Sequence, residues 1–172
     1  MSSSGTQQKP KYDVYISYRR NGGFETAKFV SLSLRERGYR VFFDFEEMRS
    51  GSFNGQLDDA IGSASDFVLI LSKDALERCS NEGDWLRKEI EYALKSHKNI
   101  IPLMLNDFEW PVSLPAGLEG LQYMNGVLVS QEYFDAMMDH LAKRLKSSPA
   151  GRSADKKKES FIRRLIRSIT GN

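Results

Sequence analysis

The chain has 172 residues, enough for one compact domain with a hydrophobic core and short tails, and its 40% hydrophobic and 28% charged content is ordinary for a soluble globular protein. No apolar stretch approaches the roughly 18 residues that a membrane span requires. The net charge of +2 is uneven, because residues 152–172 carry a local +5 and residues 1–151 carry −3, so the mildly acidic body argues against a nucleic-acid partner.

The polar residues 1–10 predict a disordered leader ahead of a domain at 11–147, and they lack the basic and apolar regions of a secretory signal. The single cysteine, Cys79, cannot form an internal disulfide, which fits a reducing, cytoplasmic location. One thiol and two distant histidines, His97 and His140, are too few for a zinc centre. We therefore expect no metal and no bound cofactor.

Five short apolar segments predict buried β-strands. They are Tyr12–Ser17, Tyr39–Phe43, Phe67–Leu71, Asn99–Leu105 and Val127–Val129. The third reads Phe-Val-Leu-Ile-Leu, a continuous apolar run that is typical of a strand covered on both faces.

Helix-forming segments separate these strands. They are Glu25–Arg37, Leu57–Ser65, Trp85–Ser96 and Tyr133–Leu145. In the first helix we expect Phe29 and Leu32 to widen the inward apolar stripe, and Gly38 to end the helix. In the third we expect Asp84 as the N-cap, and an ion pair between Glu91 and Lys95.

The alternation of strands and helices predicts an α/β fold, a five-stranded parallel sheet flanked by helices. In such sheets the ligand crevice lies at the carboxyl ends of the strands. Here those ends lead into the loops Arg19–Gly23, Asp44–Asn54 and Ser72–Asp84. A phosphoacceptor receiver domain shares this topology, but it needs an aspartate at the end of the third strand, which reads Leu71-Ser72-Lys73. We reject that alternative.

Several segments resemble the pattern of TIR (Toll/interleukin-1 receptor homology) domains. Tyr12–Tyr18 resembles the conserved first motif of these domains, and Asp44–Phe53 occupies the place of the family's BB loop. Trp85–Glu89 has the W-x-x-x-E spacing of TIR domains that cleave NAD. Further similarity lies at Ser17–Asn21, Lys98–Ile100 and Phe108–Pro111. The resemblance covers roughly residues 11–146 and is strongest to the NAD-cleaving TIR domains of the animal sterile-alpha-and-TIR-motif family. It implies a flavodoxin-like TIR fold with NAD as substrate.

Glu89 is the candidate catalytic carboxylate. Nicotinamide on ribose is a cationic, good leaving group, so bond cleavage needs stabilisation of an oxocarbenium-like ribose rather than a general acid. Trp85, four residues earlier, lies on the same helix face and can wall the ribose pocket. The alternative is that Glu89 is an ordinary surface glutamate on an amphipathic helix.

The first loop holds further candidate substrate-binding residues. Arg19 and Arg20 follow the first strand, where they either hold the pyrophosphate or form a solvated basic turn. Gly22 lets the backbone come close to a ligand ahead of a helix N-terminus, and Ser17 ends the strand beside it.

The second loop adds two candidates. Asp44 ends the second strand facing the expected pocket, and Phe53 stands where the resemblance implies an aromatic that stacks on a base. The alternative for Phe53 is a place in the core. The Arg-Asp-x-x-Pro-Gly form of this loop is absent, and Arg49 stands where the sterile-alpha-and-TIR-motif family is acidic, which weakens the expectation of loop-mediated assembly contacts.

Residues 148–172 predict a basic linker followed by a short amphipathic helix. Apolar residues recur at helical spacing within 156–170, with arginines largely opposite them. Such a segment can contact an anionic membrane surface or a protein partner.

Two functions remain open on the sequence. The first is an NAD glycohydrolase that gives nicotinamide and ADP-ribose or a cyclic isomer, with the active site completed by other TIR domains in a homo-oligomer. The second is a non-enzymatic adaptor that only nucleates TIR–TIR assemblies. The presence of Glu89 beside Trp85 favours the enzyme, because a scaffold has no use for a carboxylate in the crevice.

Overall fold

The computed structural model describes residues 11–43 and 59–149. Within these ranges one parallel sheet has the strand order β2-β1-β3-β4-β5. The strands are β1 (Val14–Tyr18), β2 (Val41–Phe43), β3 (Asp66–Leu71), β4 (Asn99–Met104) and β5 (Val127–Leu128). The five-stranded parallel sheet predicted from the sequence is confirmed.

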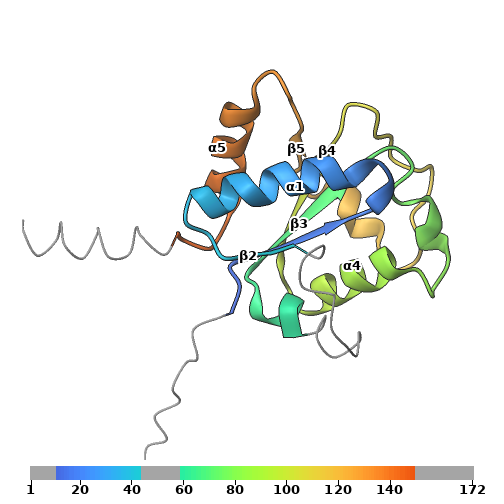
Figure 1. The fold of residues 1–172 in the computed structure, drawn as a ribbon. Coiled ribbons are helices and arrows are strands. Elements are labelled where there is room, and N and C mark those ends of the chain that lie inside the picture. Colours follow the sequence, from blue (N-terminus) through green and yellow to red (C-terminus); the bar gives the residue numbers. More distant parts are fainter. Residues whose placement is uncertain (1–10, 44–58, 150–172) are drawn as a thin grey trace, which may run out of the picture.

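Helices cover both faces of this sheet (Figure 1). They are α1 (Arg20–Glu36), α4 (Trp85–Lys95) and α5 (Phe134–Arg144), with 3-10 helices η1 (Glu77–Ser80) and η2 (Glu119–Tyr123), and residues 59–63 are also helical. Helices α1 and α5 pack on one face, whereas α4 packs on the other. Among the described residues, no helix has both the length and the apolar character needed to cross a bilayer.

Helix α1 begins earlier than the sequence predicted. It starts at Arg20 instead of Glu25, although Asn21 and Gly22 have non-helical backbone angles that kink its first turn. Part of the stretch that was predicted as a loop is therefore an irregular helical turn. At the other end Gly38 has a φ of 88°, a conformation that favours glycine, and it ends the helix as predicted.

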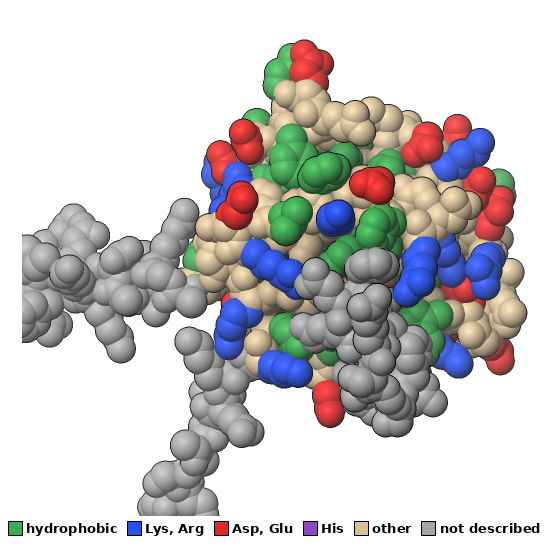
Figure 2. Space-filling model, in the orientation of Figure 1, with side chains coloured by type: hydrophobic (Ala, Val, Ile, Leu, Met, Phe, Trp, Pro, Cys, Tyr) green, Lys and Arg blue, Asp and Glu red, His purple; other side chains and the backbone are tan. Residues whose placement is uncertain are grey.

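The expected inward orientation of Phe29 and Leu32 is wrong. Their exposed fractions are 56% and 46%, and Figure 2 shows hydrophobic side chains among charged ones on this face of the molecule. The reason is that α1 buries only a narrow stripe of Ala27, Val30 and Leu34 against the sheet, so residues on its flanks face solvent.

The two-residue period of β1 separates its side chains between the two faces. Val14 and Ile16 belong to the core beneath α1 and α5, whereas Tyr15 belongs to the core beneath α4. Ser17, two residues further on, lies on the same side as Tyr15. This alternation brings a tyrosine and a serine hydroxyl towards α4.

Some predictions lie outside the described residues. They are the leader 1–10, the second-loop residues Asp44 and Phe53, and the tail segment 156–170.

Candidate active site around Glu89

Glu89 is buried, and three side chains donate hydrogen bonds to its carboxylate. Its exposed fraction is 4%, which excludes the reading as an ordinary surface glutamate. Tyr15 Oη donates to Oε1 at 2.9 Å, Trp85 Nε1 donates to the same oxygen at 2.7 Å, and Ser17 Oγ donates to Oε2. The donors come from β1 and from α4 itself, so the carboxylate joins the helix to the central part of the sheet.

The Trp85–Glu89 contact follows from helix geometry. Residues four apart lie one above the other on a helix, and here the indole N–H of Trp85 reaches the carboxylate directly. The helix starts at Trp85 because Asp84 caps it, its side chain accepting from the backbone N–H of Arg87 at 3.1 Å, as predicted. Glu91, however, bonds to Arg87 at 2.7 Å instead of to Lys95, so that predicted ion pair is wrong.

Tyr15 was missed by the sequence analysis. Its ring is stacked between Phe42 and Phe67, with centroid distances of 5.0 and 5.4 Å and interplanar angles of 10° and 4°. The sheet register makes both phenylalanines its direct cross-strand neighbours. The stack fixes the ring, and thereby the hydroxyl that meets Glu89. The signal in the sequence was its two-residue spacing from Ser17.

The chemistry of this cluster depends on the type of its donors. A carboxylate is an acceptor only, with about four lone-pair positions, and three of its partners here are side-chain donors. The O–H bonds of Tyr15 and Ser17 and the indole of Trp85 can rotate away from the carboxylate, and the hydroxyls of a bound sugar can then donate to it instead. A buried carboxylate with exchangeable partners can therefore hold a diol and stabilise a cation that develops next to it.

Arg19 is committed to contacts within the protein. Its guanidinium forms a two-pronged pair with Asp84, with Nη1–Oδ2 at 2.7 Å and Nη2–Oδ1 at 2.9 Å. Its Nε and Nη2 also donate to the carbonyl of Ala75, at 3.2 and 2.9 Å. These bonds connect the end of β1 to the segment that leads into α4.

The ionisation of this group fits a stable ion pair. Burial alone raises the pKa of Asp84, but the hydrogen bond and charge of Arg19, with the N–H of Arg87, outweigh it and lower that pKa below its usual value. Burial likewise opposes the charge on Arg19, but Asp84 outweighs it and raises its pKa. Burial and the negative charge of Asp84 raise the pKa of Cys79 to about 12. A catalytic thiolate at Cys79 therefore finds no support.

The remaining predicted residues lie around the same end of the sheet. Gly22 has a φ of 80°, and a Cβ added there would lie 3.2 Å from Ser72 just after β3, so both conformation and space favour glycine. Arg20 is exposed at the start of α1. The structure thus brings Ser17, Trp85 and Glu89 into contact, while Asp44 and Phe53 lie outside the described residues.

Comparison with known proteins gives a consistent result. The family model described as TIR domain matches residues 14–146. NAD(+) hydrolase sarm1 of Drosophila melanogaster is 39% identical over 150 residues, which cover 84% of this chain and 11% of that protein. NAD(+) hydrolase SARM1 of Danio rerio is 37% identical over 156 residues, which cover 87% of this chain and 22% of that protein. The chain thus spans between 11% and 22% of the length of these two curated relatives.

The fold is also that of solved structures. The crystal structure of the TIR domain of the Toll-related receptor TRR-2 from Hydra magnipapillata matches with a TM-score of 0.54 and 19% identity, covering 79% of this chain and 99% of that one. At this identity the similarity concerns the fold alone.

Proposed function

The chain belongs to the TIR domain family, as its motifs predicted, and we propose that it is an NAD glycohydrolase. It cleaves the nicotinamide–ribose bond of NAD and releases nicotinamide with ADP-ribose or a cyclic isomer. The observation that carries this proposal is the buried Glu89 carboxylate, held by side-chain donors from β1 and from its own helix. The relatives named NAD(+) hydrolases, at 37% and 39% identity, support the same reaction.

The proposed reaction needs no general acid, because nicotinamide is a good leaving group. The bond between ribose C1′ and the pyridinium nitrogen breaks, and its electron pair leaves with nicotinamide, which becomes neutral. Positive charge develops on the ribose ring, where the Glu89 carboxylate stabilises it. Water then adds to C1′ and loses a proton to give ADP-ribose, or an adenine nitrogen adds instead to give a cyclic product.

Three neighbours prepare Glu89 for this role in the proposal. Tyr15 and Ser17 hold the carboxylate before substrate binds, and the ribose hydroxyls then replace part of these contacts. Trp85, half-buried, walls the sugar and keeps water from the reacting carbon until nicotinamide has left.

The arginines have different proposed roles. Arg19 positions the start of α4 through its pair with Asp84, so it acts through the helix that carries Glu89. Arg20, exposed at the same end of the sheet, is the better placed of the two to meet the pyrophosphate. Gly22 lets the backbone of this turn pack closely against Ser72 and, in the proposal, come close to the ligand. Asp44 and Phe53 complete the proposed pocket, the latter by stacking on a base.

Self-association is part of the proposal. The exposed apolar side chains of Phe29 and Leu32 on α1 suit a contact between copies of the domain. We further propose a cytoplasmic location, no resident cofactor, and a partner role for the tail 156–170 at a membrane surface or on a protein.

The decisive experiment measures nicotinamide release by the wild type and by Glu89→Ala at matched oligomeric state. We expect the variant to lose at least about 100-fold in rate, the size of effect that removing a group which stabilises transition-state charge produces. Glu91→Ala is the matched control, because it removes a carboxylate from the same helix whose partner, within residues 11–43 and 59–149, is Arg87. Substantial activity in Glu89→Ala would overturn the catalytic assignment. A wild type that releases no nicotinamide even at high protein concentration would favour the adaptor instead.

A further inference from the structure

The exposed side of α1 carries a narrow stripe of side chains. Glu25, Phe29, Leu32 and Glu36 follow one another at spacings of four, three and four residues, so they lie along one face of the helix. All of them are exposed, and this face lies opposite the side that packs on the sheet. Figure 2 shows hydrophobic and acidic side chains close together on this face of the molecule. The α1 stripe is therefore apolar at its centre and acidic at both ends.

The charges of the α1 stripe suit a basic partner. Within residues 11–43 and 59–149, neither Glu25 nor Glu36 forms an ion pair. Lys28 borders the stripe on one side only. Apolar side chains between two carboxylates match an amphipathic helix that carries a basic residue at the end of its apolar face.

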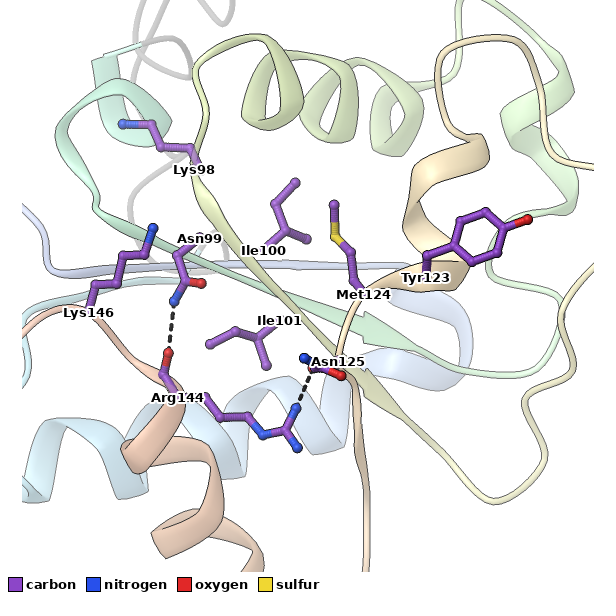
Figure 3. Close-up of a pocket in the computed structure, with 9 residues that line it drawn as sticks. All are labelled: Lys98, Asn99, Ile100, Ile101, Tyr123, Met124, Asn125, Arg144 and Lys146. Carbon is purple, nitrogen blue, oxygen red and sulfur yellow. Dashed lines mark hydrogen bonds between the residues drawn. The ribbon is translucent and has the colours of Figure 1, made fainter.

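The end of α5 is fixed to neighbouring segments. The side-chain amide of Asn99, at the start of β4, donates to the carbonyl of Arg144 at 2.9 Å, and the guanidinium of Arg144 donates to the carbonyl of Asn125 (Figure 3). The residues after α5 therefore start from a defined place.

The chain leaves the domain next to the C-terminal end of α1. Ser147 Oγ donates to the carbonyl of Asp13 at 3.0 Å, and the N–H of Asp13 donates to the carbonyl of Arg40 at 2.7 Å. Arg40 is only four residues beyond Glu36, the last residue of α1. Figure 1 shows the end of the described chain beside this end of α1. Residues 150–158 span up to about 30 Å when extended, which is enough to bring residue 158 to Glu36.

The sequence after this point contains a matching stripe. Lys158, Ile162, Leu165 and Ile169 are separated by four, three and four residues, the same intervals as in the α1 stripe. The arginines of this segment lie largely on the other side of the helix that this spacing predicts. The segment thus has an apolar face with a basic residue at its beginning.

We propose that residues 158–169 form a helix that docks antiparallel on the α1 stripe of the same chain. The facing pairs are Lys158 with Glu36, Ile162 with Leu32, Leu165 with Phe29, and Ile169 with Glu25. The net charges of +5 for residues 152–172 and −3 for residues 1–151 favour this contact. A helix of this length is marginal alone, but the short connection to α5 gives it a high effective concentration at α1.

The docked tail covers Phe29 and Leu32, the side chains that suit a contact between copies of the domain. The tail therefore opposes self-association, and a second copy has to displace it. This regulatory consequence rests on the proposed function, whereas the docking itself does not.

The first test compares ¹⁵N NMR spectra of the full chain and of Leu165→Asp, which places a charge in the middle of the apolar face of the tail. We expect the ratio of docked to free tail to fall at least about tenfold, because burial stabilises a leucine and disfavours an aspartate, and the amide signals of residues 25–36 should shift. Ser160→Asp adds the same charge on the opposite side of the predicted helix and should leave these signals in place. Unchanged α1 signals in Leu165→Asp would overturn the proposal. So would wild-type α1 signals that move on dilution, since a second copy would then occupy the stripe.

Charge reversal tests the antiparallel arrangement. Glu36→Lys places two positive charges together and should lower the ratio of docked to free tail about two- to fivefold, the size expected for an exposed pair. Adding Lys158→Glu restores an opposite pair and should recover most of this loss. The same addition to Glu25→Lys should give no recovery, because that position lies at the far end of the stripe. Equal recovery in both cases, or recovery with Glu25→Lys alone, would contradict the arrangement.

The regulatory consequence has its own measurement. Sedimentation of Leu165→Asp should show self-association at a lower protein concentration than for the wild type, and Ser160→Asp should match the wild type. If the NMR spectra show docking but Leu165→Asp associates as the wild type does, the regulatory consequence is wrong and the docking stands. Neither measurement uses NAD, so both outcomes are independent of the proposed cleavage reaction.

Discussion

Two buried carboxylates, Asp66 and Glu89, are held in opposite ways by the same sheet. Asp66 is the first residue of β3 and has no exposed surface. It accepts from the backbone N–H groups of Lys146 and Ser147, at 2.8 and 2.9 Å, and from the side-chain amide of Asn99. These hydrogen bonds hold the chain after α5 against the starts of β3 and β4, so this carboxylate has a structural role.

Glu89, in contrast, accepts hydrogen bonds from three side-chain donors. The O–H bonds of Tyr15 and Ser17 and the indole of Trp85 can each rotate without breaking a strand or a helix, while the ring of Tyr15 stays stacked between Phe42 and Phe67. Backbone donors cannot be exchanged for a ligand unless secondary structure is lost, whereas these can. Burial alone therefore does not distinguish a structural from a functional carboxylate, but the nature of the donors does.

Asp66→Ala should give the largest loss of stability. Its removal leaves two backbone N–H groups and an amide without their acceptor, and we expect the free energy of unfolding to fall by about 2–3 kcal/mol. Urea denaturation followed by circular dichroism measures this value. Glu89→Ala is the matched comparison and should lose less, because its donors can turn to water. If Glu89→Ala were the more destabilised of the two variants, the distinction drawn from the donors would be wrong.

Tyr15→Phe tests whether a side-chain donor to Glu89 contributes to the proposed activity. It removes one donor to Glu89 and keeps the ring between Phe42 and Phe67, so the fold should stay intact. A hydrogen bond to a charged group contributes on the order of 1.5–3 kcal/mol, and part of it is regained from water, so we expect nicotinamide release to fall about 3- to 10-fold.

The control for Tyr15→Phe is Tyr18→Phe on the same strand. The ring of Tyr18 packs with Phe24 and Phe43 on the other face of the sheet. Its substitution should leave the rate of nicotinamide release unchanged. Equal rates in the wild type and both variants would show that Tyr15 does not position Glu89.

The order of elements and much of the candidate site could be predicted from the sequence. Continuous apolar runs located β3 and β4, and the four-residue spacing placed Trp85 beside Glu89. Both depend on local periodicity, which a sequence displays directly. The resemblance to a family then assigned a role to Glu89 that spacing alone did not.

What could not be predicted depends on contacts between distant segments. Arg19 is 65 residues from Asp84, and nothing local indicates which carboxylate its guanidinium meets. The Tyr15 hydroxyl reaches Glu89 only once the sheet register has fixed its ring. Periodicity also gives the direction of a helix stripe but not the width of the surface it covers, which is why Phe29 and Leu32 were placed wrongly.

The third prediction, with the smallest expected effect, concerns the Arg19–Asp84 pair. This pair should make the stability of the protein depend on pH. Because the pKa of Asp84 is lowered in the folded protein, the unfolded chain binds a proton more readily. The stability that this carboxylate contributes is therefore fully present above its unfolded pKa, about 4, and is lost as pH falls through the lower folded value. Asp84→Asn keeps a residue suited to the N-cap and does not titrate.

Urea midpoints measured from about pH 6 down to about pH 3 should therefore fall more steeply for the wild type than for Asp84→Asn. Every other carboxylate titrates in both proteins, so the difference between the two slopes isolates Asp84. At neutral pH the variant should also be the less stable, because Arg19 then keeps its charge without a carboxylate to meet it. Parallel slopes would mean that the pair adds no charge-dependent stability, and that Arg19 is free to leave Asp84 for an anionic ligand.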